Sequence, residues 1–183
     1  MKISAKETDT GKINPPPHAH PFVAVMYRNR GERDQLQGIM QERFGRLLGC
    51  GPEYRVAEFT DYYRREFGDQ LQKQFWVFST PLEMENFHRH KVWSNSIEGP
   101  EDRKQRTANI DPGYLAPSKL VLFSTKNFSH RVYLGNGIYG EVTLLYEHGK
   151  FRFLPWTYPD YQWEENVRFL WQMRSQIVAI ARR

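Results

Sequence analysis

The sequence predicts an α+β protein with a ferredoxin-like β-α-β-β-α-β core, a C-terminal β-hairpin extension and a terminal helix. Up to residue 111, apolar residues switch between strand and helix spacings in the order of that core. A glycine-rich hairpin pattern and a long amphipathic segment follow it. The 183 residues fit a single α+β domain, which we place at residues 21–183.

The first twenty residues predict an arm rather than a part of the domain. They are polar and end in the proline-rich stretch PPPHAH. Burial of so few apolar side chains would offset only a little of the conformational entropy that ordering costs. We therefore expect residues 1–20 to be disordered or extended. His18 and His20 could serve as metal ligands, although an exposed tail is the commoner setting for such residues.

The first half of the predicted core is a strand, a helix and a second strand. Residues 22–27 (FVAVMY) combine β-branched and aromatic side chains, which is typical of a buried strand. Residues 33–48 carry apolar side chains at the spacing of one helical face, and glycines follow them. Residues 54–63 then predict the second strand.

The second half of the core repeats the order strand, helix, strand. Residues 71–78 predict the third strand. In the following helix we expect Thr80 as the N-cap and Glu83 as its capping-box partner. Residues 106–111 predict the fourth strand, which should end at a Pro-Gly turn over residues 112–113.

Beyond the core, the sequence predicts a sheet extension and a covering helix. We expect an apolar segment at 120–125, a hairpin at 130–146, a strand at 150–154 and a helix over 163–181. The helix carries two apolar stripes. So wide an apolar face should pack on the sheet, or partly on another subunit in a homodimer.

The hairpin allows a prediction of register. If Gly135-Asn136-Gly137 is a three-residue loop, the alternation separates an apolar face from a polar and aromatic one. The opposed pairs are then Leu134 with Ile138, Tyr133 with Tyr139, and Arg131 with Glu141. As an alternative to a binding site, the last two pairs would form a mostly exposed structural salt bridge beside a tyrosine pair.

Ionisable residues are dense in the same part of the chain, and some of them suggest proton transfer. The candidate catalytic residues are Asp111, His130 and Glu141, with His130 as the acid/base. Asp111 together with Glu141 or Asp160 could hold Mg²⁺, the one cofactor that we consider. Asp111 also precedes Pro-Gly, where aspartate is often only a turn former.

Basic and aromatic residues suggest ligand binding in this region. The candidate ligand-binding residues are Lys126, Arg131, Tyr133, Tyr139, Tyr158 and Asp160. Lys126 offers a point charge and Arg131 a planar fork for a phosphate or carboxylate, unless residues 125–131 are only a basic surface loop. Around Tyr158, aromatic rings could stack on a base or sugar, or Thr157 or Asp160 could cap the last helix. We expect Asp111, Lys126, His130, Arg131 and Glu141 to converge on one cavity.

Composition narrows the protein class. The net charge is +5, which is compatible with a solvated basic surface or with phosphate-bearing partners. The single cysteine, Cys50, excludes an internal disulfide framework. No apolar run approaches the roughly 18 residues of a membrane span, and the N-terminus lacks the apolar stretch of a signal peptide. We therefore expect a cytoplasmic protein that does not enter the membrane.

Several segments together resemble a known family. These are NIDPGYL, STKNFSHRVYL, GIYGEVTLLY and LPWTYPDY, together with EFTDYY and the Lys91–Asn95–Glu98 spacing. They resemble an uncharacterised prokaryotic family catalogued as domain of unknown function 4416, over residues 21–174. The resemblance implies no particular activity. A GTP-binding role lacks support, since the sequence has no GxxxxGK(S/T) phosphate loop.

Two functional hypotheses follow from the sequence. The first is a binding protein for a small-molecule phosphate or a nucleotide, or an enzyme acting on a phosphorylated metabolite. The alternative is a non-catalytic RNA- or protein-binding module that uses a basic–aromatic surface. A deep pocket enclosing Asp111, Lys126 and His130 would favour the first hypothesis. A flat basic sheet with exposed tyrosines would favour the second.

Overall fold

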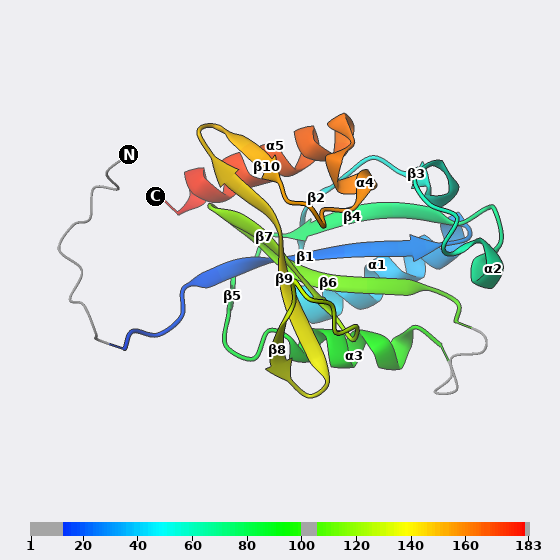
Figure 1. Cartoon of the computed structure of the whole chain (residues 1–183), viewed down its shortest axis with the longest axis horizontal. Coiled ribbons are helices and arrows are strands. Elements are labelled where there is room, and N and C mark those ends of the chain that lie inside the picture. The colour runs from blue at the N-terminus through cyan, green and yellow to red at the C-terminus, as the bar shows by residue number, and fades with distance from the viewer. Residues whose placement is uncertain (1–12, 100–105, 182–183) are drawn as a thin grey trace.

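The computed structural model describes residues 13–99 and 106–181, and ten strands within them form one antiparallel sheet (Figure 1). The strands span His18–Tyr27 (β1), Leu47–Cys50 (β2), Tyr54–Arg55 (β3), Gln72–Phe78 (β4), Leu82–Glu83 (β5), Asn109–Ala116 (β6), Lys119–Ser124 (β7), Val132–Gly135 (β8), Ile138–Glu147 (β9) and Lys150–Phe153 (β10). Their order is β10-β9-β7-β6-β1-β4-β2, while β3 pairs with β4, β5 with β1 and β8 with β9.

Helices cover both faces of this sheet and confirm the α+β class. They span Arg30–Phe44 (α1), Arg64–Phe67 (α2), Arg89–Ile97 (α3), Pro159–Gln162 (α4) and Glu164–Ile180 (α5), with a 3₁₀ turn at Val56–Glu58 (η1). Figure 1 shows α5 on one side of the sheet and α1 and α3 on the other. No helix of the described residues is long and apolar enough to cross a membrane.

The two largest of the four apolar clusters among the described residues lie on the two covered faces of the sheet. On one face, Phe169 and Met173 of α5 pack in the same cluster as Phe22 of β1. On the other face, Met40 of α1 packs in a cluster with Val23 of β1. Consecutive residues of β1 thus enter opposite cores, as expected of a central strand between two helical layers.

The N-terminal end of β1 corrects the predicted arm. β1 begins at His18, so residues 18–20 belong to the sheet and not to an arm. His20 is buried, and its Nδ1 lies 2.9 Å from the Phe78 carbonyl oxygen. Residues 13–17 are exposed, and residues 1–12 lie outside the described part of the chain.

The strand that follows the first helix lies earlier than predicted. The first helix ends at Phe44, where Gly45 adopts φ +82°, and β2 follows at once. Residues 54–63 form only the two-residue β3, η1 and a loop, so the prediction of a strand there was largely wrong. At Gly49, β2 approaches α5 closely, because a Cβ there would lie 2.6 Å from Met173 Sδ.

The predicted helix start at Thr80 was wrong as well. The residues after Thr80 form β5, in which Leu82 pairs with Ala19 and Glu83 with His18. The helix α3 begins at Arg89. The residues of the capping-box pattern form a strand and not a helix, because β5 pairs with the extended start of β1.

The predicted end of the fourth strand was also wrong. β6 continues through Pro112 and Gly113 to Ala116, so Asp111 lies within a strand and not at a turn. Pro112 is opposite Val23 of β1 but has no register partner in β7, whose pairing with β6 begins at Gly113. A strand accommodates proline where a ladder hydrogen bond is not required.

The C-terminal half agrees more closely with the prediction. Tyr133 is opposite Tyr139 as predicted, but the predicted three-residue loop was wrong. β8 ends at Gly135, which is opposite Ile138, so only residues 136 and 137 form the turn, and a register shift lies between Tyr133 and Gly135. The last helix, α5, packs on the sheet through Phe169, Met173 and other residues.

Candidate functional site

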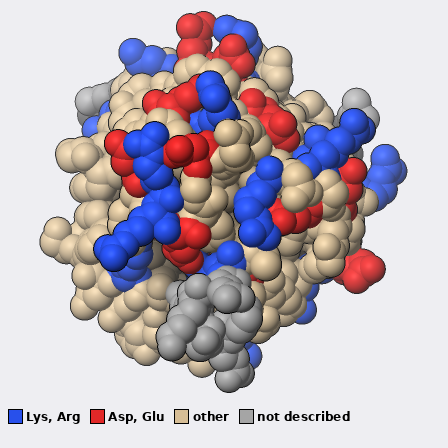
Figure 2. Space-filling view, turned by 90° about the vertical axis from the view of Figure 1, so that its right-hand side faces the viewer, with Lys and Arg blue, Asp and Glu red and all other residues tan. Residues whose placement is uncertain are grey.

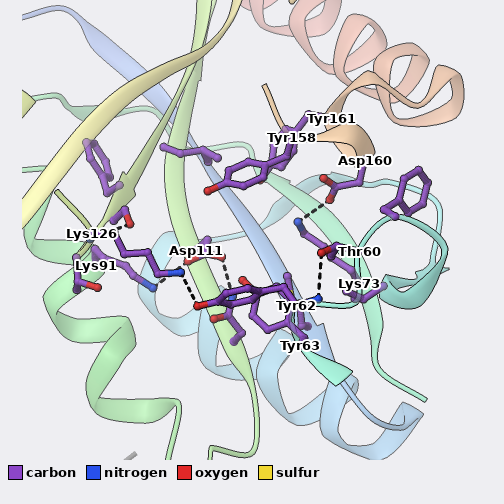
Figure 3. Close-up of a pocket in the computed structure, with 18 of the residues that line it drawn as sticks. Thr60, Tyr62, Tyr63, Lys73, Lys91, Asp111, Lys126, Tyr158, Asp160 and Tyr161 are labelled. Carbon is purple, nitrogen blue, oxygen red and sulfur yellow. Dashed lines mark hydrogen bonds and ion pairs between the residues drawn. The ribbon is translucent and has the colours of Figure 1, made fainter. Parts of the chain in front are cut away.

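A cavity of about 680 Å³ lies where the sheet meets the segment that contains α4 (Figure 3). Its floor comes from β1, β4, β6, β7 and β9, and its walls come from residues 54–66, α3, the loop after β7 and α4. Five Lys or Arg side chains, five Asp or Glu side chains and five tyrosines of the described residues line it. So much polar surface exceeds what a packed core requires.

Lys91 of α3 is buried at this cavity and joins two carboxylates. Its Nζ donates to Glu98 Oε1 at 3.1 Å, to Asp111 Oδ1 at 3.0 Å and to the Ile110 carbonyl oxygen at 2.6 Å. All three ammonium hydrogens therefore have acceptors. The lysine fixes the end of α3 against β6 and places one positive charge beside Asp111.

Arg106 extends this network toward α2. It donates to both carboxylate oxygens of Glu66, at 2.6 and 2.7 Å, and to Glu98 Oε2 at 3.2 Å. It also donates to Asn109 Oδ1 at 2.9 Å, and Asn109 Nδ2 donates to Asp111 Oδ2 at 2.6 Å. The strand β6 is thereby tied to α2 by charge-assisted hydrogen bonds.

Asp111 is an ionised carboxylate at neutral pH. Burial opposes its ionisation, but the positive charges of Lys91 and Lys73 and the hydrogen bonds from Lys91 and Asn109 outweigh burial and hold its pKa below the ordinary value. Its side chain is 29% exposed and lines the cavity. A carboxylate with a lowered pKa is a weak proton acceptor but a good hydrogen-bond acceptor.

A second buried pair lies at the α4 side of the cavity. Asp160 Oδ2 accepts from Lys73 Nζ at 2.6 Å and from the Tyr54 hydroxyl at 2.7 Å. Burial first, and then the charge of Asp160, raises the pKa of Tyr54, so the phenol stays protonated and donates. Lys73 Nζ also lies 5.0 Å from the centre of the Tyr161 ring. Asp160 therefore pairs with β4 and does not cap a helix.

Arg131 and Glu141 form a buried pair, contrary to the expectation of a mostly exposed one. Their side chains are 3% and 2% exposed, and Arg131 Nε donates to Glu141 Oε2 at 2.6 Å. Arg131 also donates to Ser124 Oγ at 2.8 Å, to the Lys126 carbonyl oxygen at 3.1 Å and to the Tyr158 hydroxyl at 3.1 Å. Its guanidinium therefore holds the loop after β7 against β9 and the segment before α4.

Lys126 differs from the other cations of the cavity. It is exposed, and its Nζ donates to the Tyr62 hydroxyl at 3.0 Å and lies 4.5 Å from the centre of that ring. Within residues 13–99 and 106–181, no carboxylate forms an ion pair with it. Figure 3 shows this ammonium group in the same part of the cavity as Asp111.

The structure gathers most, but not all, of the predicted residues. Those that line the cavity are Asp111, Lys126, Arg131, Glu141, Tyr158 and Asp160. His130 instead lines a second cavity of about 510 Å³, where it stacks on Trp156, although its Nε2 lies 3.0 Å from Glu141 Oε2. Tyr133 and Tyr139 pair with ring centres 5.2 Å apart and do not line the main cavity. The convergence of all five ionisable residues on one cavity was therefore wrong for His130.

Sequence reasoning missed several residues of the cavity. These are Tyr54, Lys73, Lys91, Asn95, Glu98, Arg106 and Tyr161. One signal was present for part of the set, because the spacing of Lys91, Asn95 and Glu98 places them on neighbouring turns of a helix. Lys73 gave a second signal, since it is a charged residue within an apolar strand.

The carboxylates considered for Mg²⁺ already have protein partners. Asp111 pairs with Lys91, Glu141 with Arg131 and Asp160 with Lys73. Among the residues that the structure describes, no group of three or more His, Cys, Asp or Glu side chains is placed to hold a metal ion. The charged side chains of this cavity are therefore arranged as ion pairs, except for Lys126, which has no carboxylate partner among the described residues.

Comparison with known proteins gives one match. The model of the family described as Domain of unknown function (DUF4416) matches residues 17–176, which include every residue discussed for the main cavity. Searches of curated proteins and of solved structures found no match.

Proposed function

The chain belongs to this family, whose description assigns no activity, and from the chemistry of the main cavity we propose that it binds a small molecule carrying a phosphate group. The observation that carries the proposal is Lys126. It is the one lining cation without a carboxylate partner among the described residues, and it lies beside a cavity rich in tyrosines. A volume of about 680 Å³ lies within the usual range of small-molecule sites.

The charge balance of the cavity supports Lys126 as the phosphate contact. The other four lining cations each pair with a lining carboxylate. An anion bound next to these four cations would compete with their carboxylate partners. At Lys126 it would compete only with the hydrogen bond to the Tyr62 hydroxyl. The neighbouring Ser124 and Thr125 also line the cavity and could add hydroxyl donors.

Binding is better supported than catalysis. The lowered pKa of Asp111 makes it a poor general base near neutral pH. His130, the other candidate for proton transfer, lines the second cavity. The roles proposed here are therefore a phosphate contact for Lys126, orientation of the loop for Arg131 and Glu141, and ligand contacts for Asp111, Tyr158 and Asp160.

Isothermal titration calorimetry of the full chain with inorganic phosphate and a panel of phosphorylated metabolites tests the proposal. Lys126→Ala should weaken binding of the best ligand by about 10- to 100-fold, since it removes a charge-assisted hydrogen bond. Lys150→Ala is the matched control, because Lys150 is exposed on β10 and lines neither cavity described above. Binding that is absent, or equal in Lys126→Ala and the control, would contradict the proposal.

A basic–aromatic surface for RNA or a protein partner remains the alternative. Tyr62, Tyr133 and Tyr158 are exposed and support it. Against it, Figure 2 shows Asp and Glu side chains interleaved with Lys and Arg on the end of the molecule that carries α2. Single-stranded RNA that binds with a steep salt dependence would favour this alternative over a small molecule.

We also propose a ferredoxin-like assignment for the core. The order β6-β1-β4-β2, with α1 between β1 and β2 and α3 between β4 and β6, supports it. In this assignment, β7 to β10 extend the sheet beyond β6, and α5 covers the face opposite to α1 and α3. The cavity then lies where the core and its extension meet.

A further inference from the structure

The part of the main cavity that Lys91, Arg106 and Asp111 line has few hydrogen-bond donors to offer a ligand. Lys91 Nζ uses all three of its hydrogens on protein oxygens. Arg106 donates through Nε, Nη1 and Nη2 to Glu66, Glu98 and Asn109. Lys91 therefore has no hydrogen left for an anion, and Arg106 has four of its five N–H groups committed to the walls.

Acceptors, in contrast, are available there. Each carboxylate oxygen of Asp111 accepts one bond from the protein and can accept a second one. Both side-chain bonds of Asp160 end on Oδ2. Among the described residues, the Asn95 Oδ1 atom is buried without any hydrogen-bond partner, and Asn95 lines the cavity. A buried acceptor without a donor is costly, and a ligand that brings a donor to Asn95 would relieve that cost.

The donor should be a hydroxyl and not an ammonium group. The carboxylates beside these acceptors are already paired with Lys73 and Lys91, so the cavity offers a ligand cation no unpaired carboxylate to offset its desolvation. A hydroxyl donates without charge and can also accept from Tyr63 or Tyr161, whose pKa values burial raises, so that they stay protonated. Tyrosine faces can in addition pack against the C–H groups of a saturated ring.

We propose that the ligand is a phosphorylated polyol, such as a sugar phosphate, whose hydroxyls donate to Asn95, Asp111 and Asp160 while its phosphate contacts Lys126. This inference rests on the proposed function and adds the class of the organic part. Figure 3 shows Asp111 and Asp160 in different parts of the cavity, with Lys126 near Asp111. Several hydroxyls of one ligand could therefore form hydrogen bonds at the same time.

Titration calorimetry with pentose and hexose phosphates, their mono-deoxy analogues and inorganic phosphate tests this. The best sugar phosphate should bind at least about tenfold more tightly than inorganic phosphate, and one of its deoxy analogues at least about tenfold more weakly than the parent. Asn95→Leu is the decisive variant, because Asn95 Oδ1 has no protein bond to lose. It should keep or raise the melting temperature, keep phosphate affinity and lose sugar-phosphate affinity at least about tenfold.

The outcomes separate this inference from the proposed function. If sugar phosphates and inorganic phosphate bind equally well and both depend on Lys126, the anion site stands and the polyol class is wrong. Unchanged sugar-phosphate affinity in Asn95→Leu would also overturn the polyol class. If no compound binds in a way that depends on Lys126, the proposed function fails and this inference fails with it.

Discussion

Replacement of Arg131 by alanine should strongly destabilise the protein, because Glu141 would lose its main partner inside the structure. The two side chains are 3% and 2% exposed. After the substitution, Glu141 would keep only His130 at 3.0 Å and Thr143 at 3.4 Å. The three further hydrogen bonds from Arg131 to Ser124, Lys126 and Tyr158 would be lost too.

The expected cost is about 3–5 kcal/mol of unfolding free energy, the range for removing one partner of a buried ion pair. With a urea m value of about 2 kcal/mol per molar, the midpoint of unfolding should fall by about 1.5–2.5 M. Arg152→Ala is the matched control. Its ion pair with Glu147 also ends on β9, but the side chains are 55% and 44% exposed, so the cost should stay below about 1 kcal/mol.

Urea unfolding followed by circular dichroism measures both variants. The double variant Arg131→Met with Glu141→Leu tests the cause, since it removes both charges and should recover much of the loss. Equal costs for Arg131→Ala and Arg152→Ala would refute the reasoning. A double variant as unstable as Arg131→Ala would show that the lost hydrogen bonds, and not the uncompensated carboxylate, dominate.

Two further predictions concern pH and backbone packing. Burial, and then the nearby charge of Arg43, lowers the pKa of His90 to about 4. The unfolded chain therefore binds more protons than the folded chain between about pH 6.5 and 4. The free energy of unfolding should therefore decrease as the pH is lowered through that window. His90→Phe should flatten the fall in denaturation midpoints, and an equally steep fall would exclude His90 as a cause. Gly113→Ala should prevent stable folding, since a Cβ there would lie 2.1 Å from the Val121 carbonyl oxygen, whereas Gly38→Ala, with open space around it in α1, should stabilise by up to about 1 kcal/mol. Melting temperatures check both, and a tolerated Gly113→Ala would contradict the close approach of β6 and β7.

Local sequence patterns predicted the elements whose signals are local. Strands were predicted at residues 22–27 and 71–78 and are present as β1 and β4, and the helical spacing of residues 163–181 correctly predicted α5. The Tyr133–Tyr139 pairing also followed from the alternation, although the turn has two residues and not the three predicted. In each of these segments, hydrophobic periodicity and turn residues agree with the surroundings that the fold provides.

The patterns failed where a distant segment decided the local structure. The capping-box pattern at Thr80 gave way to pairing of β5 with the start of β1, more than sixty residues earlier. The Pro-Gly pair after Asp111 became part of a long strand, because β1 pairs with β6 on both sides of it. A sequence window of ten residues contains no information about such partners.

The sequence by itself determined the fold class, most of the strands and the region, residues 109–161, that supplies much of the cavity. Apart from the Arg131–Glu141 pair, which the hairpin pattern predicted, only the tertiary structure decided which charges meet. It paired Lys73 with Asp160 across 87 positions, placed Lys91 against Asp111, buried Arg131 with Glu141 and moved His130 to another cavity. The physical reason is that hydrophobic periodicity is written along the chain, whereas an ion pair depends on distance in space between side chains that the fold alone brings together.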